Sequence, residues 1–252
     1  MDYLAKKHPH KRDLCITFDE GPHIYTINRD SNYTSVTTWN HSHFEKFDAD
    51  VIIGRMMNSR NWSKSKYFGQ SVDEIKEGWE INRKEAAAAG TAMHLDIERY
   101  YNNIPVNNNS TEFQYFKNFE EAFPDLVPYR TEWMIWDLEL KMAGSIDMIY
   151  KNEDGTISIF DWKRSKQIKK SSGNWGKTST TPCISHIPDS NFWHYALQLN
   201  TYKAIIERNY GLKVKDLVLI CLYPENKNYQ YISVPNLQNE IANLFEIRKS
   251  QI

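Results

Sequence analysis

Three residues near the middle of the chain are of types that could hold a metal ion and act on a phosphate. Asp147, Asp161 and Lys163 lie in two short apolar runs that are separated by the polar turn 152–155. A carboxylate inside an apolar strand is costly unless a cation meets it. Mg²⁺ prefers oxygen ligands, and in enzymes that act on phosphate groups it is commonly held by one or two carboxylates. These residue types therefore indicate metal-assisted chemistry on a phosphate ester.

The two apolar runs, Gly144–Tyr150 and Ile157–Trp162, are typical of a β-hairpin because each has strand-like residues and a polar turn containing glycine joins them. If the hairpin turns about the centre of that polar segment, residue 147 lies opposite residue 161. Because side chains alternate faces along a strand, we expect Asp147, Asp161 and Lys163 to project from one face of a sheet. The hairpin would then bring the three groups together.

The order Asp147, thirteen residues, Asp161–Trp162–Lys163 resembles the D…(D/E)xK signature of the PD-(D/E)XK nuclease superfamily, with aspartate where glutamate is more common. A surface hairpin with a solvated Asp–Lys pair is the alternative interpretation. A second stretch, GTAMHLDIE from Gly90 to Glu98, is similar to the G-x-x-x-H-x-x-(I)-E helix of RecB-like and mitochondrial-exonuclease-like members. The resemblance implies a mixed α/β fold with a restriction-endonuclease-like core, in which helices flank a central mixed β-sheet.

The second stretch falls in the longest expected helix, residues 71 to about 103, which a capping box begins. Gly90, His94 and Glu98 recur at four-residue intervals, so they share one face of that helix. Glycine costs about 1 kcal/mol relative to alanine inside a helix, and we therefore expect Gly90 to mark a break or a close contact. A helical histidine is often an ordinary core or surface residue, whereas the resemblance implies that His94 joins the two acids at the metal.

The resemblance also assigns roles within the site. It implies that Mg²⁺ or Mn²⁺ is held by His94, Asp147, Asp161 and the backbone carbonyl of Trp162, and neutral imidazole suits Mn²⁺. Lys163 would orient the attacking water or offset developing charge, and Glu98 would anchor a second metal or an outer water. The residues expected to contact substrate are Thr91, Glu132, Arg164, Lys166, Lys169, Lys170, Trp175, Gln198 and Tyr202.

These substrate contacts come from four segments, the first of which is the expected helix that carries Thr91. The long basic segment 164–190 is expected to contact a phosphate backbone, with Trp175 to stack a base, although a solvated mobile loop is the alternative. The helix that carries Gln198 and Tyr202 resembles the YxxQLxxY helix of RecB-like nucleases, and a buried amide is its alternative. Glu132 lies on the expected strand 129–137, where it could instead pair with a nearby Lys or Arg.

The remaining elements suggest an extension and a core within one compact domain overall. Residues 1–70 are interpreted as a small N-terminal β and helical extension, with helices capped by Thr38 and Asp50 and with Phe47 in the core. A loop at 62–69, rich in Ser, Lys and aromatic residues, could hold a phosphate chain and stack a base, or simply anchor itself on the surface. Residues 71–252 form the expected nuclease core and end in two strands and a helix capped by Asn236.

Composition limits the class of protein and its compartment. The 252 residues carry a formal net charge of -1, which neither supports nor excludes a nucleic-acid partner. Three scattered cysteines favour a reducing intracellular compartment (cytoplasmic, nuclear or organellar) and are too few for an iron–sulfur cluster. The resemblance, with no helicase motifs in the chain, implies a stand-alone nuclease of viral, phage or organellar character. The sequence has no apolar run of about 18 residues and no secretory signal, so no membrane contact is expected.

The leading hypothesis is a Mg²⁺- or Mn²⁺-dependent DNA exonuclease, acting on single-stranded DNA or duplex ends in replication, repair or recombination, without a nucleotide cofactor. An endonuclease with the same site is the nearest alternative. A nucleic-acid-binding module that has lost catalysis is another. A zinc hydrolase that uses His94 with His186 or His194 is the third, although the sequence contains no HExxH motif.

Overall fold

The computed structural model describes residues 2–173 and 176–252. The chain divides into two units: Met1–Glu45 with Met93–Ile252, and Lys46–Ala92. Residues 1–45, which the sequence suggested as part of an extension, therefore belong to the larger unit. Among the helices in the described ranges, none is both long enough and apolar enough to cross a bilayer.

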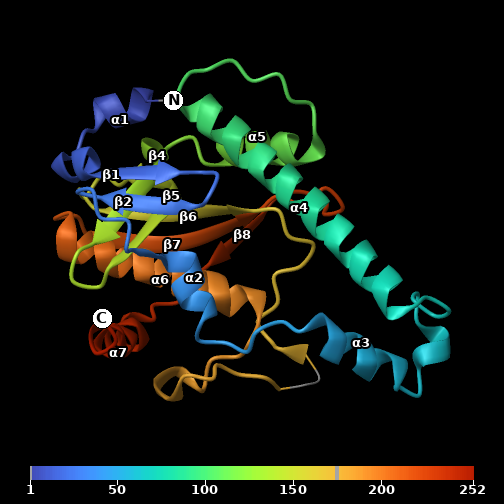
Figure 1. The fold of residues 1–252 in the computed structure, drawn as a ribbon. Coiled ribbons are helices and arrows are strands. Elements are labelled where there is room, and N and C mark those ends of the chain that lie inside the picture. The colour runs from blue at the N-terminus through green and yellow to red at the C-terminus, as the bar shows by residue number, and fades with distance from the viewer. Residues whose placement is uncertain (1, 174–175) are drawn as a thin grey trace. The chain divides into compact units, whose positions relative to one another are not determined.

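A six-stranded mixed sheet forms the centre of the larger unit (Figure 1). Its strands are β3 (Thr34–Ser35), β4 (Val127–Asp137), β5 (Met142–Lys151), β6 (Ile157–Lys163), β7 (Val214–Cys221) and β8 (Gln230–Ser233). The order is β3-β5-β6-β7-β8, with β4 also paired to β5. The pairs β3–β5 and β6–β7 are parallel and the others antiparallel. The expected α/β fold with a central mixed sheet flanked by helices is confirmed.

The β5–β6 hairpin has the predicted register, because Met148 pairs with Phe160 and Lys151 with Ile157. β4 pairs along one edge of β5, so β3 and β6 must share the other edge. β3 pairs only as far as Ala143, whereas β6 begins to pair at Met148. Residues 144–147 of β5 therefore lie in a gap between β3 and β6.

Helices cover both faces of the sheet. One apolar cluster joins α2 (Val36–His41), α6 (Asn191–Asn209) and α7 (Gln238–Lys249) to one face. A second cluster joins α5 (Thr111–Ala122) and residues 93–101 of α4 (Val72–Tyr101) to the other face. Along β6, Ile157 and Ile159 belong to the first cluster, and Phe160 and Trp162 belong to the second. Strand alternation therefore turns Asp161 and Lys163 toward α6.

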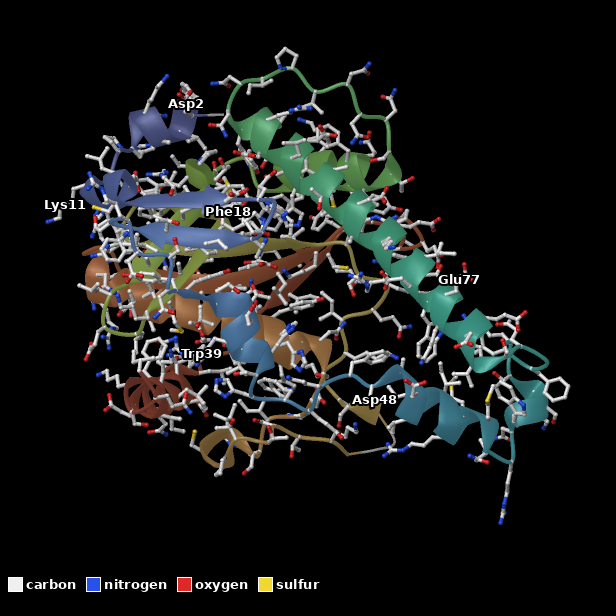
Figure 2. The ribbon with its side chains drawn as sticks, viewed as in Figure 1. Asp2, Lys11, Phe18, Trp39, Asp48 and Glu77 are labelled. Carbon is white, nitrogen blue, oxygen red and sulfur yellow. The ribbon has the colours of Figure 1, made fainter. Side chains whose placement is uncertain are left out.

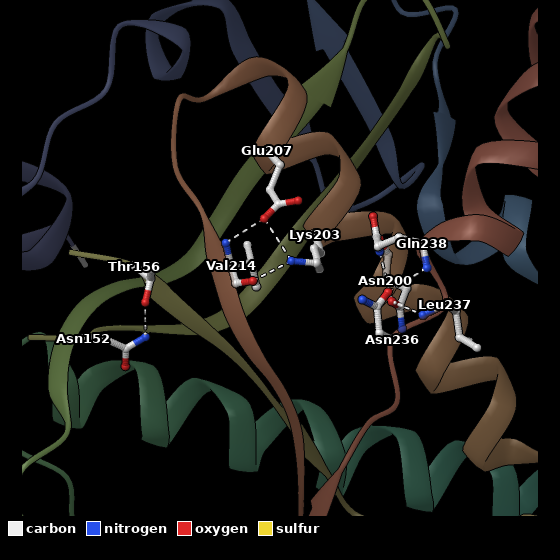
Figure 3. Close-up of polar contacts among 9 residues, drawn as sticks. All are labelled: Asn152, Thr156, Asn200, Lys203, Glu207, Val214, Asn236, Leu237 and Gln238. Carbon is white, nitrogen blue, oxygen red and sulfur yellow. Dashed lines mark hydrogen bonds and ion pairs between the residues drawn. The ribbon is translucent and has the colours of Figure 1, made fainter. Parts of the chain in front are cut away.

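Polar contacts fix α6 against the sheet and against the start of α7 (Figure 3). Lys203 donates to Glu207, 2.9 Å away, and to the Val214 carbonyl at the start of β7. The Asn200 side chain, which is fully buried, accepts a hydrogen bond of 2.8 Å from the Leu237 backbone N–H. A helix held at both points can present its side chains to β5 and β6 in fixed positions.

The N-terminal segment packs against β4. The helix α1 (Tyr3–Lys7) precedes an antiparallel hairpin of β1 (Ile16–Asp19) and β2 (Ile24–Ile27), and Figure 2 shows Phe18 on this hairpin. Between them, Asp13 accepts hydrogen bonds of 2.8 Å from Arg130 and from the Trp133 indole. Because the Arg130 side chain, which belongs to β4, is only 7% exposed, the ion pair with Asp13 neutralises its buried charge.

Three helix starts and one glycine differ from expectation. Ser35 and Asp48, rather than Thr38 and Asp50, cap α2 and α3 (Ala49–Met57), because their side-chain oxygens accept the backbone N–H three residues later. α7 likewise starts after Leu237 and not after Asn236. Gly90 neither breaks α4 nor lies in a close contact, since an added Cβ would meet nothing within 4 Å.

The smaller unit, Lys46–Ala92, contains α3, a 3-10 helix at Trp62–Lys64 and the first part of α4. The predicted capping box is confirmed, because Ser71 and Glu74 bond each other's backbone N–H. Phe47 was expected in the core, but it is 71% exposed. In this unit the chain forms two packed helices, too few to enclose every apolar side chain.

Candidate active site

Four elements bring the chemistry-bearing residues together. His94 comes from the second part of α4, Glu132 from β4, Asp147 from the gap segment of β5, and Asp161 and Lys163 from the end of β6. All five residues belong to the larger unit. Asp147 lies in the gap between β3 and β6, where no backbone partner from either strand pairs with β5.

His94 faces two carboxylates. Its Nδ1 lies 3.4 Å from Asp147 Oδ2 and 3.8 Å from Glu132 Oε1. Its other nitrogen, Nε2, lies 2.9 Å from the carbonyl oxygen of Trp162, and because a carbonyl only accepts, Nε2–H is the donor. This bond fixes the ring so that Nδ1 points at the acids, as the outer hydrogen bond of a metal-binding histidine does.

Asp147 occupies the place where β5 and β6 separate. Its Oδ2 accepts a hydrogen bond of 2.9 Å from the Trp162 backbone N–H. The Asp147 side chain thus replaces the backbone carbonyl that would accept this hydrogen bond if the two strands were still paired. The expectation that Asp147, Asp161 and Lys163 project from one face is therefore refined. Asp161 and Lys163 face α6, whereas the Asp147 carboxylate lies against the β6 backbone.

Asp161 and Lys163 form a buried ion pair. Lys163 Nζ lies 2.6 Å from Asp161 Oδ2, and the two side chains are 17% and 3% exposed. The carboxylate of Asp161 is therefore neutralised by the ammonium group of Lys163 rather than by solvent. The ammonium also lies 4.6 Å from the ring centroid of Tyr195 on α6, a contact that the sequence did not reveal.

Glu132 holds an unusual backbone conformation. Its φ is +42°, a left-handed value that is strained for a residue with a side chain. Because Thr131 pairs with Met148 and Trp133 with Ile146, Glu132 lies opposite Asp147. Ser145 Oγ donates to its Oε2 over 3.0 Å. The strain thus falls at the point where the second carboxylate is turned toward His94.

His94, Glu132 and Asp147 each offer a ligand atom, and these atoms lie within 4.8 Å of one another. One imidazole nitrogen and two carboxylates suit Mn²⁺ and are tolerable for Mg²⁺. The residues therefore fit a hard divalent cation. The geometry differs from expectation in three respects. Glu132, predicted as a substrate contact, joins this set. Asp161, predicted as a ligand, is paired with Lys163, and the Trp162 carbonyl, also predicted as a ligand, accepts the hydrogen bond from His94.

Burial and neighbouring charges change the acidities. Burial lowers the pKa of His94, but Asp147 and Glu132 outweigh it and raise that pKa to about 9. Burial raises the pKa of Asp161 to about 6 although Lys163 opposes the change, and burial also raises that of Asp147. Burial would lower the pKa of Lys163, yet Asp161 and Asp147 raise it, so the amine stays protonated.

Glu98 lies one helical turn beyond His94 on α4. Burial raises its pKa to about 7, and the nearby charge of Glu132 adds to the effect. A carboxyl group with this pKa can take up or release a proton at neutral pH. Its expected roles, anchoring a second metal or an outer water, stay predictions.

The other predicted contacts have varied surroundings. Gln198 donates to the Tyr202 hydroxyl over 3.0 Å, but Tyr202 is only 3% exposed. Its ring packs on β5 so closely that a Cβ on Gly144 would lie 2.8 Å from Tyr202 Cε1. Tyr202 is thus placed to position Gln198 and β5. Thr91 is exposed on α4 and belongs to the smaller unit.

The basic segment after Lys163 finds carboxylates from distant parts of the chain. Arg164 pairs with Glu112 at 2.6 Å and Lys166 with Glu225 at 3.0 Å. Lys169 and Lys170 are exposed, and Trp175 lies outside the described residues. The charges within the segment could not reveal these partners, because both acids are more than 50 residues away along the chain.

Comparison with protein-family profiles and with curated proteins finds no match to this chain. Among solved structures, it resembles a protein named SSO0001, with 15% identity and a TM-score of 0.37 over 88% of this chain and 78% of that chain. It also resembles a structure named putative exonuclease from Eubacterium rectale, with 13% identity and a TM-score of 0.39 over 87% of this chain and 78% of that chain. At these values neither likeness says what this chain acts on.

Proposed function

We propose that this protein is a divalent-metal-dependent deoxyribonuclease that acts as an exonuclease on single-stranded DNA or duplex ends. The observation that carries the proposal is the convergence of His94, Glu132 and Asp147 beside the Asp161–Lys163 ion pair. A metal-binding set next to a fixed ammonium group provides both parts needed for phosphodiester hydrolysis: activation of water and stabilisation of charge on the phosphate.

Each residue has a role that follows from its surroundings. A Mg²⁺ or Mn²⁺ ion held by His94, Glu132 and Asp147 would polarise the phosphate and acidify water. Lys163 donates to a phosphate oxygen and offsets the charge that develops there, while Asp161 holds the ammonium in place. Glu98 accepts the proton of the attacking water as the water oxygen bonds to phosphorus. As the bond from phosphorus to the leaving oxygen breaks, that oxygen takes a proton from solvent water and departs as a hydroxyl group.

The direct test is digestion of end-labelled single- and double-stranded oligonucleotides with Mg²⁺ or Mn²⁺. We expect Asp147→Asn and Lys163→Ala each to lower the rate by about 100-fold or more without unfolding the protein. Lys215→Ala is the matched control, since Lys215 forms an exposed ion pair with Asp154 at the far end of the hairpin. Undiminished cleavage by both site variants, with a contaminating nuclease excluded, would refute the assignment.

The same preparation separates the alternatives. Degradation of linear DNA with closed circles left intact supports an exonuclease, whereas nicking of circles would identify an endonuclease. Tight DNA binding without cleavage under any metal would identify a binding module. A calorimetric titration that favours Zn²⁺ over Mg²⁺ and Mn²⁺ would identify a zinc hydrolase instead.

A further inference from the structure

The smaller unit carries a basic surface that the proposed active site does not use. Between Val51 and Val72 the sequence has four cations, Arg55, Arg60, Lys64 and Lys66, and no acidic residue. Arg60, Lys64 and Lys66 are exposed, and none of the three pairs with a carboxylate in the part of the chain that the structure describes. Such a local excess of charge attracts polyanions even when the whole chain is close to neutral.

Aromatic rings lie among these cations. Phe68 is 59% exposed, and its ring centroid lies 6.1 Å from that of Trp62. Lys66 Nζ lies 4.8 Å from the centroid of the Tyr67 ring, whose hydroxyl accepts a hydrogen bond of 2.8 Å from the Trp79 indole. An exposed large aromatic side chain on a small unit gains little from packing, but it offers a flat face to a ligand.

Short turns hold this surface in place. The backbone N–H groups of Trp62, Lys64, Ser65 and Phe68 each donate to the carbonyl three residues earlier. Lys76 on α4 also forms an ion pair with Asp50 on α3, which links the two helices of this unit. Figure 2 labels Asp48 and Glu77, which are close to these two residues in the sequence. Fixed turns reduce the conformational entropy that a ligand would otherwise have to remove.

We infer that Arg60, Trp62, Lys64, Lys66 and Phe68, here called the basic–aromatic segment, bind single-stranded nucleic acid. Cations neutralise its phosphates, and exposed rings stack on bases that are not already paired. The serines and asparagines between these residues leave no continuous apolar strip of the kind that enters a lipid surface. The inference rests on the proposed function for its choice of ligand, and it narrows the substrate to strands with unpaired bases.

The test measures fluorescence anisotropy of labelled oligo(dT) with the full chain in EDTA, so that binding is observed without cleavage. The triple change Arg60→Gln, Lys64→Gln and Lys66→Gln should reduce the slope of log affinity against log salt by about 2, and affinity at 0.1 M salt by about 100-fold. Phe68→Ala should lower affinity by about tenfold and leave the slope unchanged.

The control is a second triple change at exposed cations of the larger unit, Lys11→Gln, Arg29→Gln and Lys227→Gln, which should change the salt slope much less. An equal loss in both triple variants, or an unchanged affinity in the first, would overturn the inference. So would equal affinity for duplex DNA, or binding to phosphatidylserine vesicles in place of oligo(dT). Cleavage of a dinucleotide substrate distinguishes this inference from the proposed function. The first triple variant should still cleave the dinucleotide, whereas Lys163→Ala should not.

Discussion

At the scale of single residues, the site combines strain with charge. Glu132 keeps a left-handed backbone conformation in the middle of a strand, and its carboxylate joins Asp147 beside His94. Strain of this kind costs about 1–3 kcal/mol and persists where the surrounding structure imposes it. Here the pairing of β4 with β5 on both sides of Glu132 imposes it, and the result is a third side chain that offers a ligand atom beside His94 and Asp147.

The variant with glycine at position 132 should therefore be more stable than the variant with alanine there. Glu132→Ala and Glu132→Gly both remove the carboxylate, so both should weaken Mn²⁺ binding by at least about tenfold. Only glycine accepts a φ of +42° without strain, and we expect Glu132→Gly to exceed Glu132→Ala by about 1 kcal/mol in the free energy of unfolding without metal. Urea denaturation of the pair tests this, and a more stable alanine variant would show that the backbone is not strained.

The raised pKa of His94 predicts how metal binding depends on pH. Below about pH 9 its imidazole carries a proton, because Asp147 and Glu132 outweigh burial. A cation that binds Nδ1 must displace that proton, so affinity for Mn²⁺ should rise with pH and level off above about 9. Calorimetry in buffers of different ionisation enthalpy should show about one proton released per Mn²⁺ at pH 7.5. His94→Gln should bind more weakly and lose this pH dependence above neutrality.

At the scale of elements, α6 and the gap in the sheet depend on each other. α6 is fixed by Asn200 and Lys203, and its Tyr202 ring fills the space beside Gly144 in the gap segment of β5. Tyr195 on the same helix lies beside Lys163. The spacing of strands around Asp147 and the position of the ammonium group are thus controlled by one helix.

Enlarging Gly144 should disturb this arrangement. In Gly144→Ala the new Cβ would lie 2.8 Å from Tyr202 Cε1 and 3.3 Å from Val36 Cβ, so we expect a loss of about 1–3 kcal/mol in the free energy of unfolding. Tyr202→Leu should restore part of that loss in the double variant, because it frees space. Gly90→Ala is the control, since its Cβ would meet nothing within 4 Å and alanine favours the helix by about 1 kcal/mol. If the effects of Gly144→Ala and Tyr202→Leu on the free energy of unfolding were simply additive, that result would contradict the contact between position 144 and the Tyr202 ring.

At the scale of the whole molecule, the candidate site concentrates charge that folding alone does not favour. Asp147 and Asp161 are buried acids with raised pKa values, and a bound cation would offset their mutual repulsion with Glu132. A ligand that binds only the folded chain stabilises it in proportion to the logarithm of its concentration.

Addition of Mn²⁺ at about 100 times its Kd should therefore raise the free energy of unfolding by about 2.7 kcal/mol, which corresponds to roughly 5–10 °C in Tm for a chain of this size. EDTA should reverse the shift, and Asp147→Asn should abolish it. A scan of Tm against metal concentration checks this, and an equal shift in Asp147→Asn would place the cation elsewhere.

The sequence by itself determined the local elements that carry most of the candidate residues. The hairpin register that places residue 147 opposite residue 161 and the helix that carries His94 and Glu98 both follow from alternation, turn residues and spacing along short stretches. The mixed α/β class was implied by the family resemblance of the motifs in these stretches. These signals are local, because a strand or a helix repeats its side-chain directions within a few residues. Cap positions differed from expectation by one to three residues. Near α2 and α3 this happens because several neighbouring Ser, Thr, Asp or Asn residues can serve as caps.

Only the tertiary structure decided which groups meet. The gap between β3 and β6, the inclusion of Glu132 with His94 and Asp147, and the ion pairs that occupy Arg164 and Lys166 all join segments far apart in the chain. Distance along the chain says nothing about such contacts, because they depend on how strands pair and which helix covers which face. The strained φ of Glu132 is likewise imposed by its pairing with β5, and no residue type in the sequence marks it.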